Sequence, residues 1–267
     1  KSYIPRSGTA NMKLASETKS GELVIDAKGI NKTFAEKCVV SEFSIKIKRG
    51  DRIGIVGPNG VGKTTLLKIL LGEVQPDFGK IKLGTNLIIA KFDQMREQLN
   101  LENSLLQNLI DDPDVKSAGA AGQIIVRGKP KHIAGYLKEF LFSEFQLRSP
   151  VKSLSGGEKA RLLLAKIMVK ESNLLVLDEP TNDLDLETLD LLQELIGDYP
   201  GTVLLVSHDR DFLNRTVEKS IVLKGDGKFL TVEGSWFDHQ SSAKKNGNKF
   251  KPNHKASKKN SEAILNN

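Results

Sequence analysis

The chain has 267 residues, of which 39% are hydrophobic and 27% are charged, as is ordinary for a soluble globular protein with a substantial core. Its single cysteine, Cys38, excludes an internal disulfide and fits a reducing compartment. No apolar run approaches the roughly 18 residues that a membrane-spanning helix needs.

The net charge of +7 gathers at the two ends of the chain. Residues 241–267 hold seven lysines against one glutamate, and residues 1–20 hold four basic side chains against one glutamate. We predict that residues 1–20 end an inter-domain linker, that residues 21–240 form the folded domain, and that residues 241–267 are a disordered, lysine-rich tail. Because the chain begins with Lys1 rather than with methionine, we expect it to be a piece of a longer protein.

Two strands are predicted in the first part of the folded domain, at residues 23–27 and 43–48. In the second strand, Phe43, Ile45 and Ile47 alternate with polar residues, which is typical of a half-exposed antiparallel strand. Phe34 lies between the two predicted strands.

A glycine-rich loop then follows a short apolar run at residues 53–56, which predicts a buried parallel strand. Helical spacing begins at Leu66, and Gly72 can end the helix. The pattern G-x-x-x-x-G-K-T between a strand and a helix predicts a phosphate site, rather than a glycine-rich turn without a ligand. We expect backbone N–H groups and the helix N-terminus to hold phosphates, with Lys63 on the β- and γ-phosphates and the Thr64 hydroxyl on Mg²⁺. The predicted phosphate-binding residues are Gly57, Pro58, Asn59, Gly60, Val61, Gly62, Lys63, Thr64 and Thr65.

The rest of the domain alternates between strands and helices. Strands are predicted at residues 79–83, 87–92, 124–126, 174–177, 203–206, 221–223 and 229–232, with a hairpin turn at 127–130. Helices are predicted at residues 99–110, 133–142 and 187–196, and another opens at 153–158 with a buried stripe from Ala160 to Met168. This alternation predicts an α/β nucleotide-binding fold with its ligands at the carboxyl ends of the strands.

Further motifs follow the phosphate loop in a fixed order. Gln94 ends a predicted strand, L-S-G-G-E at 154–158 opens a helix, L-L-V-L-D-E at 174–179 ends a strand, and Leu184-Asp185 and His208 come after it. This ordered set resembles the nucleotide-binding domain of the ABC ATPases over roughly residues 22–240. The resemblance implies binding of ATP and Mg²⁺. It also implies an α/β P-loop fold: a mostly parallel core sheet with helices, an antiparallel β subdomain and a helical subdomain.

The resemblance also gives the single residues their roles. Asp178 would hold the metal through its water shell, and Glu179 would act as the general base on the attacking water. Gln94 would sense the γ-phosphate, the metal or the water, and His208 would contact the γ-phosphate opposite Glu179. Phe34 would stack on adenine, or else belong to the core.

One segment is expected to act on another domain's nucleotide. In the ABC family, the segment matched by Ser155, Gly156, Gly157 and Glu158 binds the γ-phosphate of ATP held by a partner domain, and Asp185 would lie at the same interface. A small hydroxyl and a helix N-terminus suit an anion that arrives from outside. The chain is therefore expected to hold half of an active site, so that alone it binds ATP but hydrolyses it poorly.

The run E-P-T-N-D-L-D at 179–185 resembles the ABC-F proteins, which carry two ATPase domains in one chain and no membrane domain. Asp183 stands where the commonest form has histidine, and this points to the Uup-like subgroup, as do residues 128–132 and 207–212. The resemblance implies the second ATPase domain of a cytoplasmic protein that acts on ribosomes or DNA. The usual C-terminal coiled coil is not recognisable in this sequence.

Two other classes of function stay open. The domain could be the ATPase subunit of an ABC membrane transporter, although transporter forms usually lack the T-N-x-L-D run. It could also be a non-hydrolysing assembly domain, against which Lys63, Asp178 and Glu179 argue. For residues 241–267, the alternatives are a solubilising linker and a sequence-independent contact with rRNA or DNA.

Overall fold

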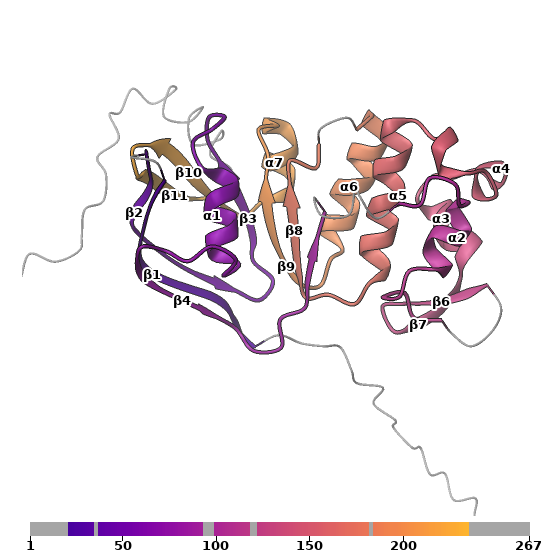
Figure 1. The fold of residues 1–267 in the computed structure, drawn as a ribbon, viewed down its shortest axis with the longest axis horizontal. Coiled ribbons are helices and arrows are strands. Elements are labelled where there is room, and N and C mark those ends of the chain that lie inside the picture. The colour runs from indigo at the N-terminus through magenta and orange to yellow at the C-terminus, as the bar shows by residue number, and fades with distance from the viewer. Residues whose placement is uncertain (1–20, 35–36, 93–98, 118–121, 182–183, 235–267) are drawn as a thin grey trace, which may run out of the picture.

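The computed structural model describes residues 21–34, 37–92, 99–117, 122–181 and 184–234 (Figure 1). The linker and the tail predicted for residues 1–20 and 241–267 lie outside these ranges. No helix within the described ranges is long and apolar enough to cross a membrane.

A six-stranded, mostly parallel sheet forms the centre of the molecule, in the strand order β11-β10-β3-β9-β8-β5. Its strands are β3 (Arg52–Val56), β5 (Ile89–Lys91), β8 (Leu174–Asp178), β9 (Thr202–Val206), β10 (Lys219–Gly225) and β11 (Lys228–Glu233). All neighbours pair in parallel except β10 and β11. Strands covered on both faces read as continuous apolar runs, and β8 and β9 were predicted from such runs. The α/β fold class is confirmed.

A second, antiparallel sheet has the order β2-β1-β4, with β1 (Leu23–Phe34), β2 (Lys37–Lys48) and β4 (Phe78–Leu83). It forms the end of the molecule at the left of Figure 1. The predicted alternation in β2 is confirmed, since Phe43 and Ile47 are buried while Ser44 and Lys46 are exposed. Both long strands run further than the sequence predicted. Shifts of register near Ile30 and Lys32 let the pairing continue through segments whose apolar alternation is interrupted.

The helices cover the central sheet on both sides (Figure 1). Helix α1 (Lys63–Leu70) packs between the antiparallel sheet and β3, whereas α5 (Gly156–Val169) and α6 (Leu186–Gly197) lie on the other side. Beyond α5 lies a group of small elements: α2 (Leu105–Ile110), the hairpin β6 (Gln123–Val126) and β7 (Lys129–His132), α3 (Ile133–Glu139) and α4 (Glu144–Leu147). Helix α7 (Arg210–Thr216) follows β9.

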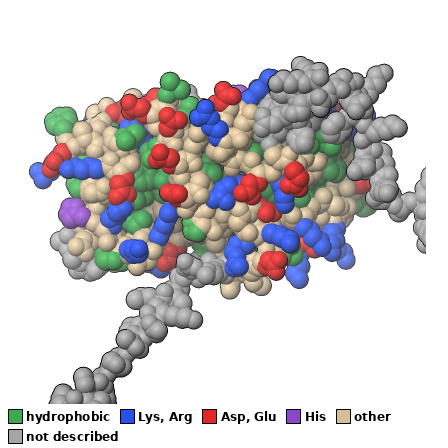
Figure 2. Space-filling model, turned by 180° about the vertical axis from the view of Figure 1, so that it is seen from behind, with side chains coloured by type: hydrophobic (Ala, Val, Ile, Leu, Met, Phe, Trp, Pro, Cys, Tyr) green, Lys and Arg blue, Asp and Glu red, His purple; other side chains and the backbone are tan. Residues whose placement is uncertain are grey.

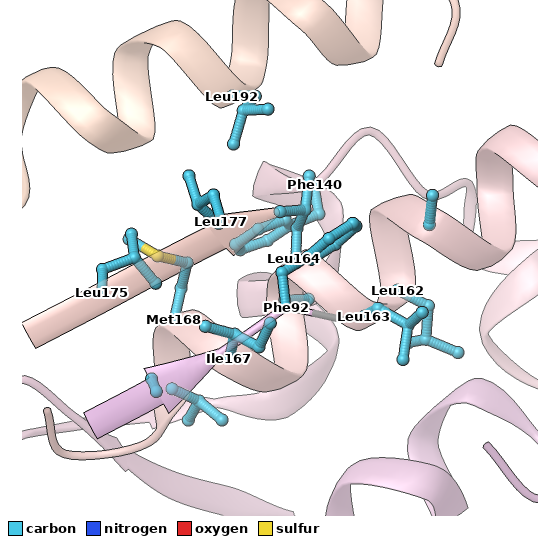
Figure 3. Close-up of a cluster of buried hydrophobic side chains, with 14 of the residues drawn as sticks. Phe92, Phe140, Leu162, Leu163, Leu164, Ile167, Met168, Leu175, Leu177 and Leu192 are labelled. Atoms are coloured by element: carbon cyan, nitrogen blue, oxygen red, sulfur yellow. The ribbon is translucent and has the colours of Figure 1, made fainter. Parts of the chain in front are cut away.

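Two buried clusters lie on opposite faces of the central sheet. Successive strand residues alternate between them, so that Leu174 and Val176 of β8 face α1 while Leu175 and Leu177 face α5. Figure 3 shows the cluster on the α5 side of the sheet, where Met168 of α5 lies in the same packed group as Leu175 and Leu177. The buried stripe predicted from Ala160 to Met168 is confirmed. It packs α5 against the face of the sheet that carries Leu175 and Leu177.

Two of the predicted helices are shorter than expected. The prediction of helix over 99–110 was wrong for residues 99–104, because the side-chain amide of Asn108 donates to the backbone carbonyls of Asn100 and Ser104 and holds that segment in a loop. The helix predicted at 133–142 ends at Glu139, and Leu141 has a φ of 62°. The sequence did not predict α4 or α7.

Candidate active site

The glycine-rich loop joins the carboxyl end of β3 to α1, as predicted. Gly62 caps α1 with a φ of 108°, and a Cβ there would lie 2.6 Å from Val39 Cγ1. A Cβ at Gly57 would lie 2.7 Å from the carbonyl oxygen of Leu223. Neither position can hold a side chain, so these two glycines allow the loop to curl tightly against β2 and β10.

Lys63 is buried under this loop, with 8% of its surface exposed. Its Nζ donates to the carbonyl oxygens of Gly57 at 3.0 Å and Pro58 at 3.4 Å, and lies 3.7 Å from Glu179 Oε1. The ammonium group is therefore held inside the loop and beside the end of β8. This position agrees with the contact to a β- or γ-phosphate that the sequence predicts for Lys63.

Thr64 and Asp178 meet directly, although 114 positions separate them in the sequence. The Thr64 hydroxyl donates to Asp178 Oδ2 at 2.8 Å. Both are hard oxygen ligands, and Mg²⁺ in phosphate sites takes only one or two protein ligands besides waters and phosphate oxygens. The pair therefore fits Mg²⁺. Across the described ranges no group of three or more His, Cys, Asp or Glu residues could hold a metal ion.

Glu179 and His208 form a second pair at the same edge of the sheet. Glu179 Oε2 lies 2.8 Å from His208 Nδ1, and the Glu179 N–H donates to the carbonyl of Val206 at 2.8 Å. Because β8 and β9 are parallel neighbours, the residues that follow both strands come together. Glu179 has a φ of 47°, a strained conformation for a non-glycine residue that commonly marks functional sites.

The start of β2 reaches the phosphate loop. Phe34 and Lys37 are cross-strand partners, and Lys37 Nζ donates to the carbonyl oxygen of Gly60. Phe34 is 46% exposed, so of the two alternatives the core position is excluded. The sequence reasoning missed Lys37, since only the folded hairpin brings it to the loop.

The 155–158 segment opens α5, as the sequence predicts, and also caps it. Glu158 N–H donates to Ser155 Oγ at 3.2 Å and Ser155 N–H donates to Glu158 Oε2 at 2.8 Å, which is a capping box. The second bond is the largest cause of the lowered pKa of Glu158. Ser155 and Gly156 are exposed. Within the described residues, no hydrogen bond or ion pair links the 155–158 segment to the phosphate loop.

Asp185 caps α6, where its carboxylate accepts from Thr188 N–H at 2.8 Å. Hydrogen bonds from Thr188 are the largest causes of the lowered pKa of Asp185. Arg161 of α5 donates from Nη2 to Asp185 Oδ2 at 3.2 Å, from Nε to Thr188 Oγ1 at 3.1 Å and from Nη1 to the carbonyl of Leu141 at 3.3 Å. This buried arginine thus ties Asp185 to the helix that Ser155 opens, a role that the sequence reasoning missed.

One predicted site residue, Gln94, lies outside the described residues, as do residues 182–183. The remaining predicted residues separate into two groups. The phosphate loop, Asp178, Glu179 and His208 converge at the carboxyl ends of β3, β8 and β9. Ser155 and Asp185 belong to the group that Arg161 connects.

Comparisons with known proteins agree with this geometry. Residues 40–182 match a family described as "ABC transporter". The chain is 49% identical over 258 residues to the ATP-binding protein Uup of Caulobacter vibrioides, an alignment that covers 94% of this chain and 41% of that protein. It is also 33% identical over 243 residues to the "Energy-dependent translational throttle protein EttA" of Haemophilus influenzae, covering 91% of this chain and 42% of that protein.

The fold is found again in cbiO1 of Clostridium perfringens, a part of the ABC transporter complex cbiONQ. That structure superimposes with a TM-score of 0.62 at 24% identity and covers 84% of this chain and 94% of that chain. A likeness at this identity concerns the fold. The chain spans less than half the length of the two sequence relatives.

Proposed function

Because this chain belongs to the ABC transporter family of ATP-binding domains, we propose that it binds ATP with Mg²⁺ and hydrolyses it as one half of a paired active site. The similarity to Uup and EttA supports an ATP-binding domain of ABC-F type.

The observation that carries this proposal is the meeting of four side chains at one edge of the sheet. Lys63 supplies a fixed positive charge to the phosphates, and Thr64 and Asp178 would hold Mg²⁺, which neutralises charge on the β- and γ-phosphate oxygens when bound. Glu179 lies 3.7 Å from the same ammonium and would accept the proton of the attacking water. Its hydrogen bond to His208 fixes the orientation of that carboxylate.

Pairing of two domains is proposed from the second group of residues. Ser155 and Gly156 are exposed at the N-terminus of α5, where N–H groups and the helix dipole favour an anion. Their hydroxyl and amide groups would complete the site around a nucleotide held by a second ABC domain. Asp185, tied to the same helix through Arg161, would contact that partner domain. We propose that this second domain belongs to the same full-length protein, because the aligned segment covers only 41% of Uup and 42% of EttA.

We further propose a cytoplasmic ABC-F protein that acts on the ribosome or on nucleic acid. The name of the relative EttA refers to translation, which favours the ribosome and hence RNA over DNA. The alternative is the ATPase subunit of a membrane transporter, in which case the protein should sediment with membranes that carry its transmembrane partner. A pull-down of the Glu179→Gln protein with ATP, analysed for rRNA against DNA, separates the first two partners.

The experiment for the proposed activity separates hydrolysis from binding. In the longer protein that carries both ABC domains, Glu179→Gln should keep ATP affinity and lose turnover, because an amide cannot take the proton of water. Glu187→Gln, an exposed change on α6, is the matched control and should keep turnover. Parental turnover in Glu179→Gln would exclude Glu179 as the base. Lost ATP affinity would show that it acts in binding instead.

A further inference from the structure

The outward side of the antiparallel sheet carries a group of lysines, which we call the lysine face: Lys28 of β1, Lys46 of β2, and Lys80 and Lys82 of β4. Strand residues alternate between the two sides of a sheet. The opposite side of this sheet presents Ile25, Phe43 and Ile47 to the core around α1, so the lysines point away from the protein body. All four are exposed. Figure 2 shows Lys and Arg side chains gathered over this end of the molecule.

Cross-strand register brings these charges together. Lys28 stands directly opposite Lys80, and Asp26 stands between Lys46 on one side and Lys82 on the other. Asp26 accepts an ion pair from Lys28 at 3.2 Å, and its Oδ1 is buried without a hydrogen-bond partner among the described residues. One carboxylate thus has three lysines as its partner and cross-strand neighbours, and a fourth, Lys80, stands opposite Lys28. No ion pair joins Lys46, Lys80 or Lys82 to a carboxylate within the part of the chain that the structure describes.

Folding does not explain this arrangement. Like charges directly opposite each other destabilise an antiparallel pair, and this is the position of Lys28 and Lys80. Lysines on edge strands protect a sheet from pairing with other chains, and β2 and β4 are edges of this sheet. Lys28, however, is on the central strand, where no edge needs protection. The positive charge therefore indicates a partner of opposite charge.

An exposed aromatic ring lies close to these lysines in the chain. Phe78 is 73% exposed and begins β4 two residues before Lys80, where it pairs with Asn31 of β1. Lysines that meet phosphates beside an aromatic ring that stacks on a base are the two parts of a site for single-stranded nucleic acid.

We propose that the lysine face and Phe78 form a binding surface for RNA with unpaired bases. The lysines contact backbone phosphates, and Lys80 and Lys82 lie about 7 Å apart along β4, so each reaches a different phosphate. Phe78 stacks on one unpaired base without reading its identity, so binding is independent of sequence. The choice of RNA rests on the proposed function, in which a ribosomal partner supplies the polyanion.

The first test measures binding of an RNA hairpin with an unpaired loop as the salt concentration is varied. Each phosphate contact with a single strand adds about 0.7 to the slope of log affinity against log salt concentration. Replacing Lys28, Lys80 and Lys82 together by glutamine removes three such contacts, so the slope should fall by about 2. The affinity should therefore fall about 100-fold at about 0.1 M salt. Phe78→Ala should weaken binding at least about 5-fold and leave the slope unchanged. The matched control replaces Lys116, Lys129 and Lys138, exposed lysines on the other side of the molecule, by glutamine and should keep the parental affinity and slope.

The second test locates the bound RNA on the intact chain. Acetylation of lysines is followed by mass spectrometry with and without the hairpin, which separates the lysine face from the lysines of residues 241–267. The hairpin should slow acetylation of Lys28, Lys80 and Lys82 several-fold and leave Lys129 unchanged. Unprotected lysines on the sheet, or a triple variant with the parental affinity and slope, would overturn the proposal.

Two controls separate this proposal from the proposed ATPase function. The triple glutamine variant should bind ATP as the parent does, because none of its three positions touches the phosphate loop. Lost RNA protection with normal ATP binding would overturn the lysine face alone, whereas a parent that binds no ATP would overturn the ATPase. Tighter binding of single-stranded DNA than of the RNA hairpin would overturn the assignment to RNA.

Discussion

Replacing Arg161 by methionine should destabilise the domain and uncouple Asp185 from the helix that Ser155 opens. Only 7% of the Arg161 surface is exposed, and its guanidinium donates to three acceptors on two other segments of the chain, the Leu141 carbonyl and the start of α6. Methionine keeps most of the apolar stem, so the change isolates the loss of these hydrogen bonds from the loss of packing.

The magnitude follows from the three bonds. The bond to the Asp185 carboxylate joins two charged groups, and the other two end at neutral oxygens of Thr188 and Leu141. Hydrogen bonds that involve a charged group contribute about 1.5–3 kcal/mol each, but removing a buried guanidinium also removes its desolvation cost. We therefore expect the free energy of unfolding to fall by about 2–4 kcal/mol.

Urea unfolding followed by circular dichroism measures this loss, provided that the slope against urea is the same in both proteins. Arg215→Met, at an exposed position in the last turn of α7, is the matched control and should change stability by less than about 0.5 kcal/mol. A loss of less than about 1 kcal/mol in Arg161→Met would refute the reasoning. In the two-domain protein the variant should also bind ATP normally but hydrolyse it more slowly.

Three further changes test separate parts of the account. Ser155→Arg should leave ATP binding to this chain intact, because the chain's own nucleotide lies at the phosphate loop. The same change should abolish hydrolysis at the site shared with the partner domain. Calorimetry measures the binding, and phosphate release measures the hydrolysis. Asp112→Asn removes the carboxylate that contacts buried Lys166 at 3.0 Å and should cost about 3 kcal/mol in urea unfolding. Burial acts to raise the pKa of Asp112, but the hydrogen bond from Lys166 and the bonds from other donors lower this pKa overall. The parent protein should therefore lose the stabilisation as the pH falls below the ordinary aspartate range. The stability of the Asp112→Asn variant should not show this loss. Deleting residues 241–267 should keep ATP binding and reduce the salt slope of duplex-DNA binding by about 3, whereas superimposable curves would make the tail a linker.

Local patterns were sufficient to predict the parts of the molecule where one short segment determines its own structure. The apolar run of β3 and the glycine-rich loop are such a segment, and the L-S-G-G-E pattern opens α5 as predicted. The order of motifs also predicted that Asp178 and Glu179 would stand beside the loop, since parallel strands end at one edge of the sheet.

Features that depend on contacts between distant segments could not be predicted in this way. Arg161 lies in the middle of an apolar helix, and its partners Leu141 and Asp185 reach it only in the folded protein. The lysine face requires the strand order β2-β1-β4, which no single strand specifies. The loop at residues 99–104 escaped prediction because a side chain, Asn108, takes the place of helical hydrogen bonds.

The proposed nucleotide site depends on the buried ammonium of Lys63, which would hold the phosphates of ATP. Titration calorimetry of the parent chain and of Lys63→Ala with ATP and Mg²⁺ measures this contribution. Loss of a charge-assisted hydrogen bond should weaken binding by about 1.5–3 kcal/mol, or roughly 10- to 150-fold, in a variant that stays folded by circular dichroism. Equal affinities in the two proteins would contradict the assignment of the phosphate loop.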